Sequence, residues 1–345
     1  MSTPQPASVP SVPQGERPCP AIKKSPMPPR RASRTPLPAL LLFLFGLSVS
    51  ASGCSIKQYA LRSTADALSN TGGSLSSDDD PELVRDAAPF GLKTMEALAA
   101  ELPQHRPLRL SLASGFAQYA YAFVQQDADR LEDKDLKTSQ LLSTRARRLY
   151  LRARDYALAG IELGHAGAKK VLLSPDRAAI KGMLDRMKPE DVPYLYWCAA
   201  SWGLAISTAK DNAYLIGDLP TVESLARRAI ELDDVYDEGA LHELFVSLAS
   251  SLSKEQGGGP ERAKQHMDRA VQLSGGRKLG VLLSYAEGVL VAQQKKAEFV
   301  QLAKKVIETN IDGDDPAWRR QRLANVIAQR RARWLLDRLG DLFAE

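Results

Sequence analysis

Histidines and acids are the residue types through which this chain could hold a metal ion. His242 and Glu243 begin the spacing of a zinc-protease helix, but position 246 is a valine, so the second histidine ligand is missing. The acidic segment 127–135 lacks the glycine and the final glutamate of a calcium loop. The histidines are scattered without the spacing of metal ligands: His105, His165, His242 and His266. We therefore expect neither a metal site nor a cofactor.

Nucleophilic and phosphate-binding motifs are also missing from the sequence. It contains no G-x-S-x-G motif, and no glycine-rich loop precedes a helix as a phosphate cradle requires. Cys198 lies in the apolar segment YLYWCAASW, without the basic neighbour that a reactive thiolate needs, so we expect a buried and unreactive thiol. These observations predict a protein that is not an enzyme.

One helical segment with two different faces points to binding chemistry. The stretch GFAQYAYAFVQQDADR, residues 115–130, places Tyr121 with Gln118 and Gln125 on one side of a helix. Unpaired amides are disfavoured in a core, and a solvent face does not select tyrosine, so we interpret these three residues as the wall of a ligand cavity. The core stripe of the same helix has ordinary spacing: Phe116, Tyr119, Ala120 and Phe123.

A second aromatic group is crowded into nine residues of a chain that is only 6% aromatic. Two interpretations are open: the rings fill a core, or they form the wall of an apolar ligand cavity, where large flat side chains fix the shape of the site. Helical spacing places Tyr194 beside Trp197 and puts Tyr196 elsewhere. Under the second interpretation the pore candidates are Tyr194, Trp197 and Trp202.

Residues 1–53 have the features of a lipoprotein signal peptide. Basic residues precede the apolar run 37–49, which is too short to span a bilayer and has the length of a signal-peptide core. The run leads into ASGC, a sequence similar to the bacterial lipobox, so we expect cleavage before Cys54 and lipidation of its thiol. An ordinary secretory peptide is the alternative, and translation starts at either Met1 or Met27.

The mature chain is predicted to have a short anchor segment and one large domain. Residues 54–79 form the lipidated N-terminus and a Gly/Ser/Asp linker, and residues 80–345 form the helical domain. A lipid anchor implies the periplasmic face of the cell envelope, and Ser55 after the cysteine favours the outer membrane.

The net charge of +5 belongs to the leader. Six of the 46 Lys and Arg residues and one of the 41 Asp and Glu residues precede Cys54, so the rest of the chain is balanced in charge. A balanced chain lacks the basic excess that nucleic-acid binding requires. We therefore expect no nucleic-acid partner.

The pattern from Asp80 onward is helical almost throughout. Asp80-Pro81-Glu82 combines a capping acid, a proline at the first helical position and an acid in the first turn, and GGGP at 257–260 separates two helices. Similar segments close five amphipathic helices: AAELP at 99, GIELG at 160, AIELD at 229, AVQLS at 270 and VIETN at 306. Their spacings of 61, 69, 41 and 36 residues approximate one or two tetratricopeptide units of about 34 residues. We expect an all-α array of antiparallel helix pairs, a tetratricopeptide-like α-superhelix whose inner helices line a concave surface.

Five segments in order carry a resemblance to a known family: SDDDPELVRDAAPFGLKTMEAL, SGFAQYAYAFVQQDADRLED, RARRLYLRARDYALAGIEL, YLYWCAASWGLAIS and RLANVIAQRRARWLLDRLGDLF. They resemble the TatT family, the lipoprotein T component of TRAP (tripartite ATP-independent periplasmic) transporters. The resemblance implies a tetratricopeptide-like protein with a ligand-permissive central pore. It also implies a homotrimer that binds the periplasmic solute-binding subunit, and solutes that are small hydrophobic molecules or organic acids.

Two functional hypotheses follow. In the first, the protein assists solute uptake by binding the solute-binding subunit and offering a pore to the ligand. In the second, it is a lipoprotein scaffold for protein–protein interactions in the envelope, without a small-molecule role. A scaffold presents an open, polar groove, whereas a conduit needs a closed, apolar lumen.

Overall fold

The computed structural model describes residues 56–70, 75–209, 211–313 and 315–344. Every regular element within these ranges is a helix and none is a strand, which confirms the expected all-α fold. The leader 1–53 and the lipidation site Cys54 lie outside the described residues, so their processing stays a prediction. No helix of the described ranges is long and apolar enough to cross a membrane.

The helices belong to one compact unit, Ser55–Glu345, which begins with a helix over residues 56–69. The first half of the array contains α3 (Pro81–Glu101), α4 (Arg106–Tyr119), η1 (Ala120–Gln125), α5 (Gln126–Leu131), α6 (Leu136–Gly164), α7 (Ala168–Leu172), α8 (Arg177–Leu184), η2 (Pro189–Asp191) and α9 (Val192–Ser207). The second half contains α10 (Ala213–Ile216), α11 (Leu219–Leu232), α12 (Tyr236–Ser251), α13 (Pro260–Ser274), α14 (Gly280–Tyr285), η3 (Ala286–Leu290), α15 (Lys296–Glu308), α16 (Pro316–Arg319), α17 (Arg322–Asp337) and α18 (Leu339–Leu342).

Capping residues fix the helix boundaries where the sequence predicts them. The Asp80 side chain accepts hydrogen bonds from the backbone N–H groups of Glu82 and Leu83 at the start of α3. Gly259 precedes Pro260, the first residue of α13, so the GGGP segment separates two helices. The five repeated segments each reach the last turn of a helix, as predicted: α3, α6, α11, α13 and α15.

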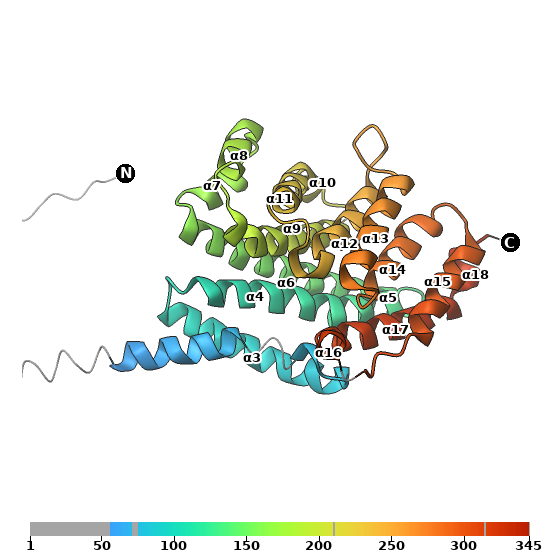
Figure 1. The fold of residues 1–345 in the computed structure, drawn as a ribbon, viewed down its shortest axis with the longest axis horizontal. Helices are drawn as coiled ribbons and strands as arrows, with labels where there is room; N and C mark the ends of the chain where they lie inside the picture. The colour runs from blue at the N-terminus through green and yellow to red at the C-terminus, as the bar shows by residue number, and fades with distance from the viewer. Residues whose placement is uncertain (1–55, 71–74, 210, 314, 345) are drawn as a thin grey trace, which may run out of the picture. The chain divides into compact units, whose positions relative to one another are not determined.

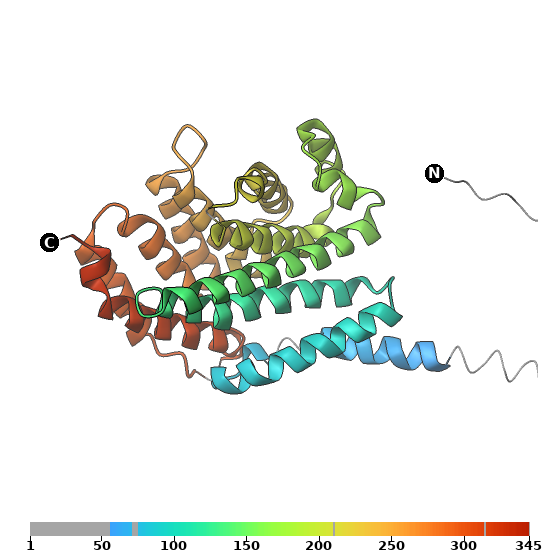
Figure 2. The same ribbon diagram turned by 180° about the vertical axis from the view of Figure 1, so that it is seen from behind.

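Successive helices pack side by side in antiparallel pairs. α4 packs against α6, α6 against α9, α9 against α11, α12 against α13, and α15 against α17. Figures 1 and 2 show this succession from opposite sides. The helix of residues 56–69 packs onto the same array through buried Ala65, and His105 contacts Asp66 at 3.0 Å. The compact unit therefore includes a helix from the segment that precedes Asp80.

The C-terminal helix α17 returns to the N-terminal helices and closes the array into a ring. Arg330 donates a hydrogen bond to Glu82 of α3 at 2.9 Å, and Arg331 donates one to Asp129 of α5 at 2.8 Å. The same contact buries a small apolar cluster of Val84, Phe123 and Ile327. Figure 1 shows α17 close to the start of α3, although Arg330 and Glu82 are 248 positions apart in the chain. These contacts join α17 to the first helices of the array.

Two π-helical segments interrupt the inner helices. η1 extends α4, and η3 extends α14. Sequence periodicity predicts one regular helix over residues 115–130, with Phe116 and Phe123 on a single stripe. Both rings are 4% exposed, which confirms their burial, but they pack into different apolar clusters. The wider turn of η1 rotates the residues that follow it, and π-segments of this kind are frequent at functional sites.

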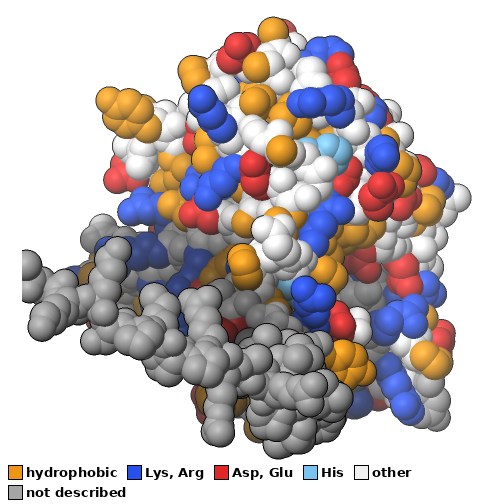
Figure 3. All heavy atoms as spheres, turned by 90° about the vertical axis from the view of Figure 1, so that its left-hand side faces the viewer, with side chains coloured by type: hydrophobic (Ala, Val, Ile, Leu, Met, Phe, Trp, Pro, Cys, Tyr) orange, Lys and Arg blue, Asp and Glu red, His pale blue; other side chains and the backbone are white. Residues whose placement is uncertain are grey.

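The outer surface carries mixed charge. Basic, acidic and hydrophobic side chains alternate on the face seen in Figure 3.

Candidate functional site

Tyr121, at the centre of the predicted cavity face, lies in η1. Its side chain remains 40% exposed, yet burial raises the pKa of its hydroxyl to about 12. Tyr121 is therefore partly exposed, although burial acts on its hydroxyl. Charged groups from four other segments act on that hydroxyl: Arg331 of α17, Glu287 of η3, Glu243 of α12 and Asp129 of α5.

Arg331 joins two of these carboxylates. Its Nε and Nη2 atoms donate to the two oxygens of Glu287 at 2.8 and 2.6 Å, and its Nη1 atom donates to Asp129 at 2.8 Å. Burial disfavours the guanidinium charge, but the hydrogen bonds and charge of Glu287 outweigh burial and raise the pKa of Arg331. The Arg331 side chain is only 15% exposed, so two carboxylates share one shielded guanidinium.

Buried polar atoms without a partner lie beside this ion cluster. Gln125 donates through Nε2 to Asp129 at 2.8 Å, but its Oε1 atom is buried and unpaired among the described residues. The hydroxyl of Tyr150, a fully buried residue of α6, is also unpaired there, and burial together with the charges of Tyr121 and Asp129 raises its pKa. A buried polar atom left unpaired costs about 1–3 kcal/mol, so an ordered water or a polar ligand group would stabilise both atoms.

α9 and α12 carry a group of aromatic rings, and α12 also carries Glu243. Tyr196 contacts Trp197 and Tyr236, with ring centroids 4.9 and 5.5 Å apart. Burial raises the pKa of the Glu243 carboxyl, and the charge of Lys278 only partly opposes that shift. The Glu243 charge in turn acts on the hydroxyls of both Tyr196 and Tyr121. The Glu243 charge therefore acts on tyrosines of two elements, η1 and α9.

The start of α12 forms a strained corner. Asp237, Glu238 and Gly239 all have positive φ angles, at 43°, 53° and 91°. Left-handed backbone is costly for the two residues that carry a Cβ, and such strain persists where surrounding contacts hold it. Lys278 supplies one of these contacts, because its Nζ atom donates to the Asp237 carboxylate at 2.7 Å. Arg277 and Arg320 both bind the Glu238 carboxylate.

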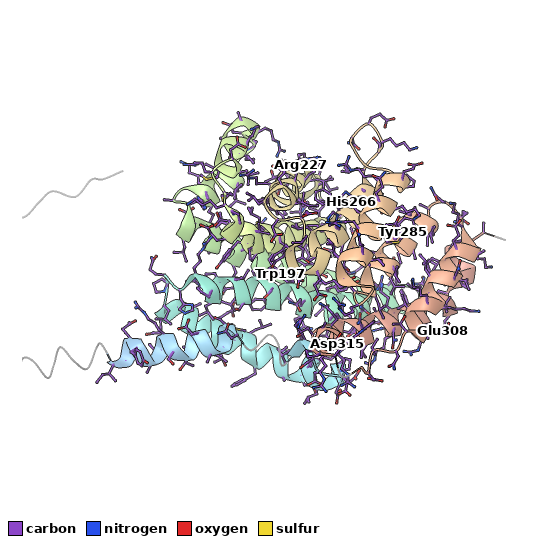
Figure 4. The ribbon with its side chains drawn as sticks, viewed as in Figure 1. Trp197, Arg227, His266, Tyr285, Glu308 and Asp315 are labelled. Atoms are coloured by element: carbon purple, nitrogen blue, oxygen red, sulfur yellow. The ribbon has the colours of Figure 1, made fainter. Side chains whose placement is uncertain are left out.

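The structure places the six predicted pore residues in different environments. Tyr121 and Gln125 lie at the ion cluster, and Trp197 lies with the rings of α9 and α12 near the middle of the array (Figure 4). Gln118 is exposed. Tyr194 and Trp202 are 6% and 1% exposed, and both pack in the main core.

Tyr194 and Trp202 have partners that explain their burial. The Arg106 guanidinium lies 4.2 Å from the Tyr194 ring centroid, and the Trp202 indole donates to Asp218 at 3.2 Å. The expectation that Tyr196 lies apart from Trp197 is wrong, because the two rings are in contact. α9 is buried on most of its circumference, so one apolar face does not decide which of its rings meet.

Sequence reasoning missed the charged half of the cluster: Glu243, Glu287 and Arg331. Two of these have a signal in the sequence, because each glutamate interrupts an apolar run, in LHELFV and in SYAEGVLV. Charged residues are rarely retained inside such runs without a partner. Arg331 has no comparable signal, since it lies in the arginine-rich segment QRRARW.

Two remaining candidates behave as ordinary packing residues. Cys198 is fully buried, which confirms the expected burial, and burial raises the pKa of its thiol to about 12. His242 and His266, which are distant in sequence, meet through their Nδ1 atoms at 2.9 Å. In the part of the chain that the structure describes, no three His, Cys, Asp or Glu side chains are grouped to hold a metal ion.

Comparison with known proteins identifies the family. The profile of the family described as TRAP transporter T-component matches residues 77–343, which is most of the chain. A protein of Treponema pallidum (strain Nichols), described as uncharacterized, is 26% identical over 317 residues, which cover 88% of this chain and 97% of the relative. The chain therefore belongs to the TRAP transporter T-component family.

Proposed function

We propose that this protein is a lipid-anchored periplasmic component that assists solute uptake by a TRAP transporter. In this proposal the ring of helices holds a small, partly hydrophobic solute in the recess around Tyr121. It exchanges that solute with the transporter's solute-binding subunit, which it binds directly. Family membership supports the link to a TRAP system.

The contacts of α17 with the N-terminal helices are the observation that supports the solute-binding part of the proposal. An open scaffold groove would not need Arg331 to bind η3 and α5 at once, or Arg330 to bind α3. The proposed recess is more polar than a simple apolar lumen. Carboxylates act on the Tyr121 hydroxyl, and the Tyr150 hydroxyl and the Gln125 amide oxygen are unpaired among the described residues. Such a wall suits a solute that has both an apolar body and a polar group.

The anchor and the assembly are further parts of the proposal. The lipobox supports a diacylglycerol on Cys54, and the following Ser55 favours the outer membrane. A homotrimer is the assembly that the family resemblance implies. A Cys54→Ala variant tests the anchor: it should be released from membranes by salt, because the lipid is the attachment we infer. A variant that still resists salt would contradict lipidation.

Crosslinking in cells tests the partner. The full-length protein should crosslink to the solute-binding subunit of a TRAP system, identified by mass spectrometry, and purified subunit should then bind the purified protein. A Glu308→Gln variant, altered at an exposed position at the end of α15, serves as the control (Figure 4). If the purified pair does not associate at micromolar concentrations, the proposed partner is wrong.

A further inference from the structure

A small pocket lies at the seam where α17 meets the N-terminal helices (Figure 1). Residues of α3, α5 and α17 line this seam pocket: Glu82, Arg85, Gln126, Arg130, Ile327 and Arg330. Its volume of about 20 Å³ exceeds the ~10–15 Å³ that a single water needs. The side chains of Glu82 and Arg330 are 64% and 42% exposed, so the pocket is accessible from solvent. It can admit the head group of a small molecule.

Two of the three arginines in the seam pocket are already engaged by carboxylates. Arg85 donates to both carboxylate oxygens of Asp127, through Nη2 at 3.0 Å and also through Nη1. Arg330 donates in the same way to both oxygens of Glu82, through Nη2 at 2.9 Å and through Nη1. Such bidentate pairs fix the position of both guanidiniums. One carboxylate therefore balances the charge of each.

Arg130 has no carboxylate of its own. Among the described residues its guanidinium makes one hydrogen bond, from Nη2 to the neutral Oε1 atom of Gln126 at 3.2 Å. The nearest described carboxylate oxygen belongs to Asp127 and lies 3.7 Å from Nη1, and it already accepts from Arg85. The three guanidiniums of the pocket face two carboxylates, those of Glu82 and Asp127. These five groups together carry one net positive charge.

The Gln126 amide offers a second hydrogen-bond donor without an acceptor. Gln126 is 2% exposed, and its Nε2 atom is buried and unpaired in the part of the chain that the structure describes. A guanidinium only donates, so Arg130 must face the amide oxygen and the amide cannot turn its nitrogen that way. Because Gln126 lines the seam pocket, a ligand in the pocket can supply the acceptor that Nε2 lacks.

The electrostatic environment of Arg130 distinguishes an anion from a water. Burial lowers the pKa of Arg130, and the charge of Asp127 opposes this shift. Three neighbouring guanidiniums lower the pKa further: Arg331, Arg85 and Arg330. A water would accept a hydrogen bond from Nε2 of Gln126, but it would leave the repulsion between the guanidiniums unchanged. A negative charge would also offset that repulsion.

We propose that the seam pocket binds a small oxyanion, a carboxylate or a phosphate group, through the guanidinium of Arg130 and the amide nitrogen of Gln126. The planar guanidinium suits the paired oxygens of either group. Because the pocket is lined by α3, α5 and α17, an anion bound there stabilises the contact of α17 with the N-terminal helices. This inference goes beyond the proposed solute uptake and does not depend on it.

Three probes that each carry one methyl group test the proposal: acetate, methylphosphonate and the neutral acetamide. Saturation-transfer NMR measures the binding of each probe to the purified full-length protein at pH 7 and constant ionic strength. At least one of the two anions should bind about tenfold more tightly than acetamide, the difference that a well-screened unit charge produces at close range. The anion that binds more tightly identifies the group, carboxylate or phosphate, that fits the pocket.

Two variants locate the anion. Arg130→Gln should remove most of the tenfold preference, and Gln126→Leu should weaken the anion without a change of charge. Arg148→Gln on α6 is the matched control, because Arg148 is exposed, has no carboxylate partner among the described residues and does not line the pocket. It should leave the binding of the anion unchanged. Circular dichroism checks that all three variants are folded.

Hydrogen exchange measures the effect of the anion on the seam. At ten times its Kd, the anion should slow the exchange of α17 amides by up to about tenfold, because it binds only the arrangement in which α17 is in place. Acetamide at the same concentration should not change the exchange of these amides.

Three results would each overturn the proposal. If neither anion binds more tightly than acetamide, the seam pocket holds only water. If Arg130→Gln and Gln126→Leu both bind the anion as the wild type does, or if Arg148→Gln weakens it as much as they do, the anion is held elsewhere. If the bound anion leaves the exchange of α17 unchanged, it does not stabilise the seam.

Discussion

Tyr121 and Phe123 are two positions apart in η1 and should respond differently to truncation. Phe123 is 4% exposed and packs with Val84 and Ile327, so Phe123→Ala should cost about 3–5 kcal/mol of unfolding free energy. Tyr121 is 40% exposed, so Tyr121→Ala should cost about 1 kcal/mol or less. Urea and thermal melts of the two variants at pH 7 measure both. Equal, large losses would mean that Tyr121 is packed on all sides, against the recess.

Glu243 should make the folded protein less stable as pH rises. Burial and the charge of Asp237 raise its pKa above the ordinary value of 4.5, and Lys278 only partly opposes them. The folded chain then holds a proton that the unfolded chain releases, so stability is fully present below pH 4.5 and is lost as pH rises through the folded pKa. Glu243→Gln should therefore raise the melting temperature at pH 7 and leave it nearly unchanged at pH 4.

Glu308→Gln is the control for that comparison, because its side chain is exposed and lies at the end of α15, well apart from Trp197 (Figure 4). It should leave the melting temperature unchanged at both pH values. A Glu243→Gln variant that melts lower than the wild type at pH 7 would show that the carboxylate has a stabilising partner.

At the residue scale, sequence alone could predict only part of the site. Tyr121 and Gln125 stand out because an aromatic and an amide share a helix face where neither core nor solvent explains them. Tyr194 and Trp202 look equally suited to a ligand wall, yet their environment is decided by Arg106 and Asp218, which lie on other elements. The sequence shows where an aromatic side chain occurs, but the residues that this side chain contacts depend on tertiary packing.

At the element scale, the Arg331 fork should contribute most to holding α17 in place. Arg331→Met leaves Glu287 and Asp129 facing each other without a cation, which should cost about 3 kcal/mol, the low end for a broken buried pair, because the groups are 15–27% exposed. Arg331→Lys keeps the charge but loses the bidentate geometry. Its free energy of unfolding should therefore lie between those of the wild type and Arg331→Met. Denaturant unfolding measures all three proteins.

The matched control is Lys264→Met, which breaks the exposed i,i+4 pair of Lys264 and Asp268 on α13. That pair is more than half exposed at both ends, so its loss should stay within about 0.5 kcal/mol. If Arg331→Met costs no more than this control, the α17 contact is a surface ion pair and does not lock the ring.

Element boundaries were predictable where the cap chemistry is local. Asp80 and Gly259 mark helix ends through hydrogen bonding and backbone freedom that neighbours along the chain decide. The π-segments η1 and η3 were not predictable, because an inserted backbone position leaves the apolar period of α4 and α14 almost intact. The left-handed corner at Asp237 and Glu238 also has no local signal, since its supports are Lys278, Arg277 and Arg320.

At the scale of the whole molecule, a repeat pattern predicts stacking but not closure. The five similar helix ends justify an array of pairs, and each pair could have stacked into an open superhelix. Closure depends on single contacts between positions 202 and 248 residues apart, Asp129 with Arg331 and Glu82 with Arg330. The spacing of the five similar helix ends does not predict these contacts.

A closed ring should exchange hydrogens differently from an open repeat array. In an open array the terminal helices fray, because each repeat is held only by its neighbours. Here α3 and α17 hold each other, so hydrogen exchange at neutral pH should protect their amides about as well as those of α6 and α9. Arg331→Met should lower protection in α17, α3 and η3 together, and leave α8, which packs on α11, unchanged. If α17 in the wild type exchanges as fast as a frayed terminus while α6 stays protected, the array is open in solution, and the recess around Tyr121 is then a groove.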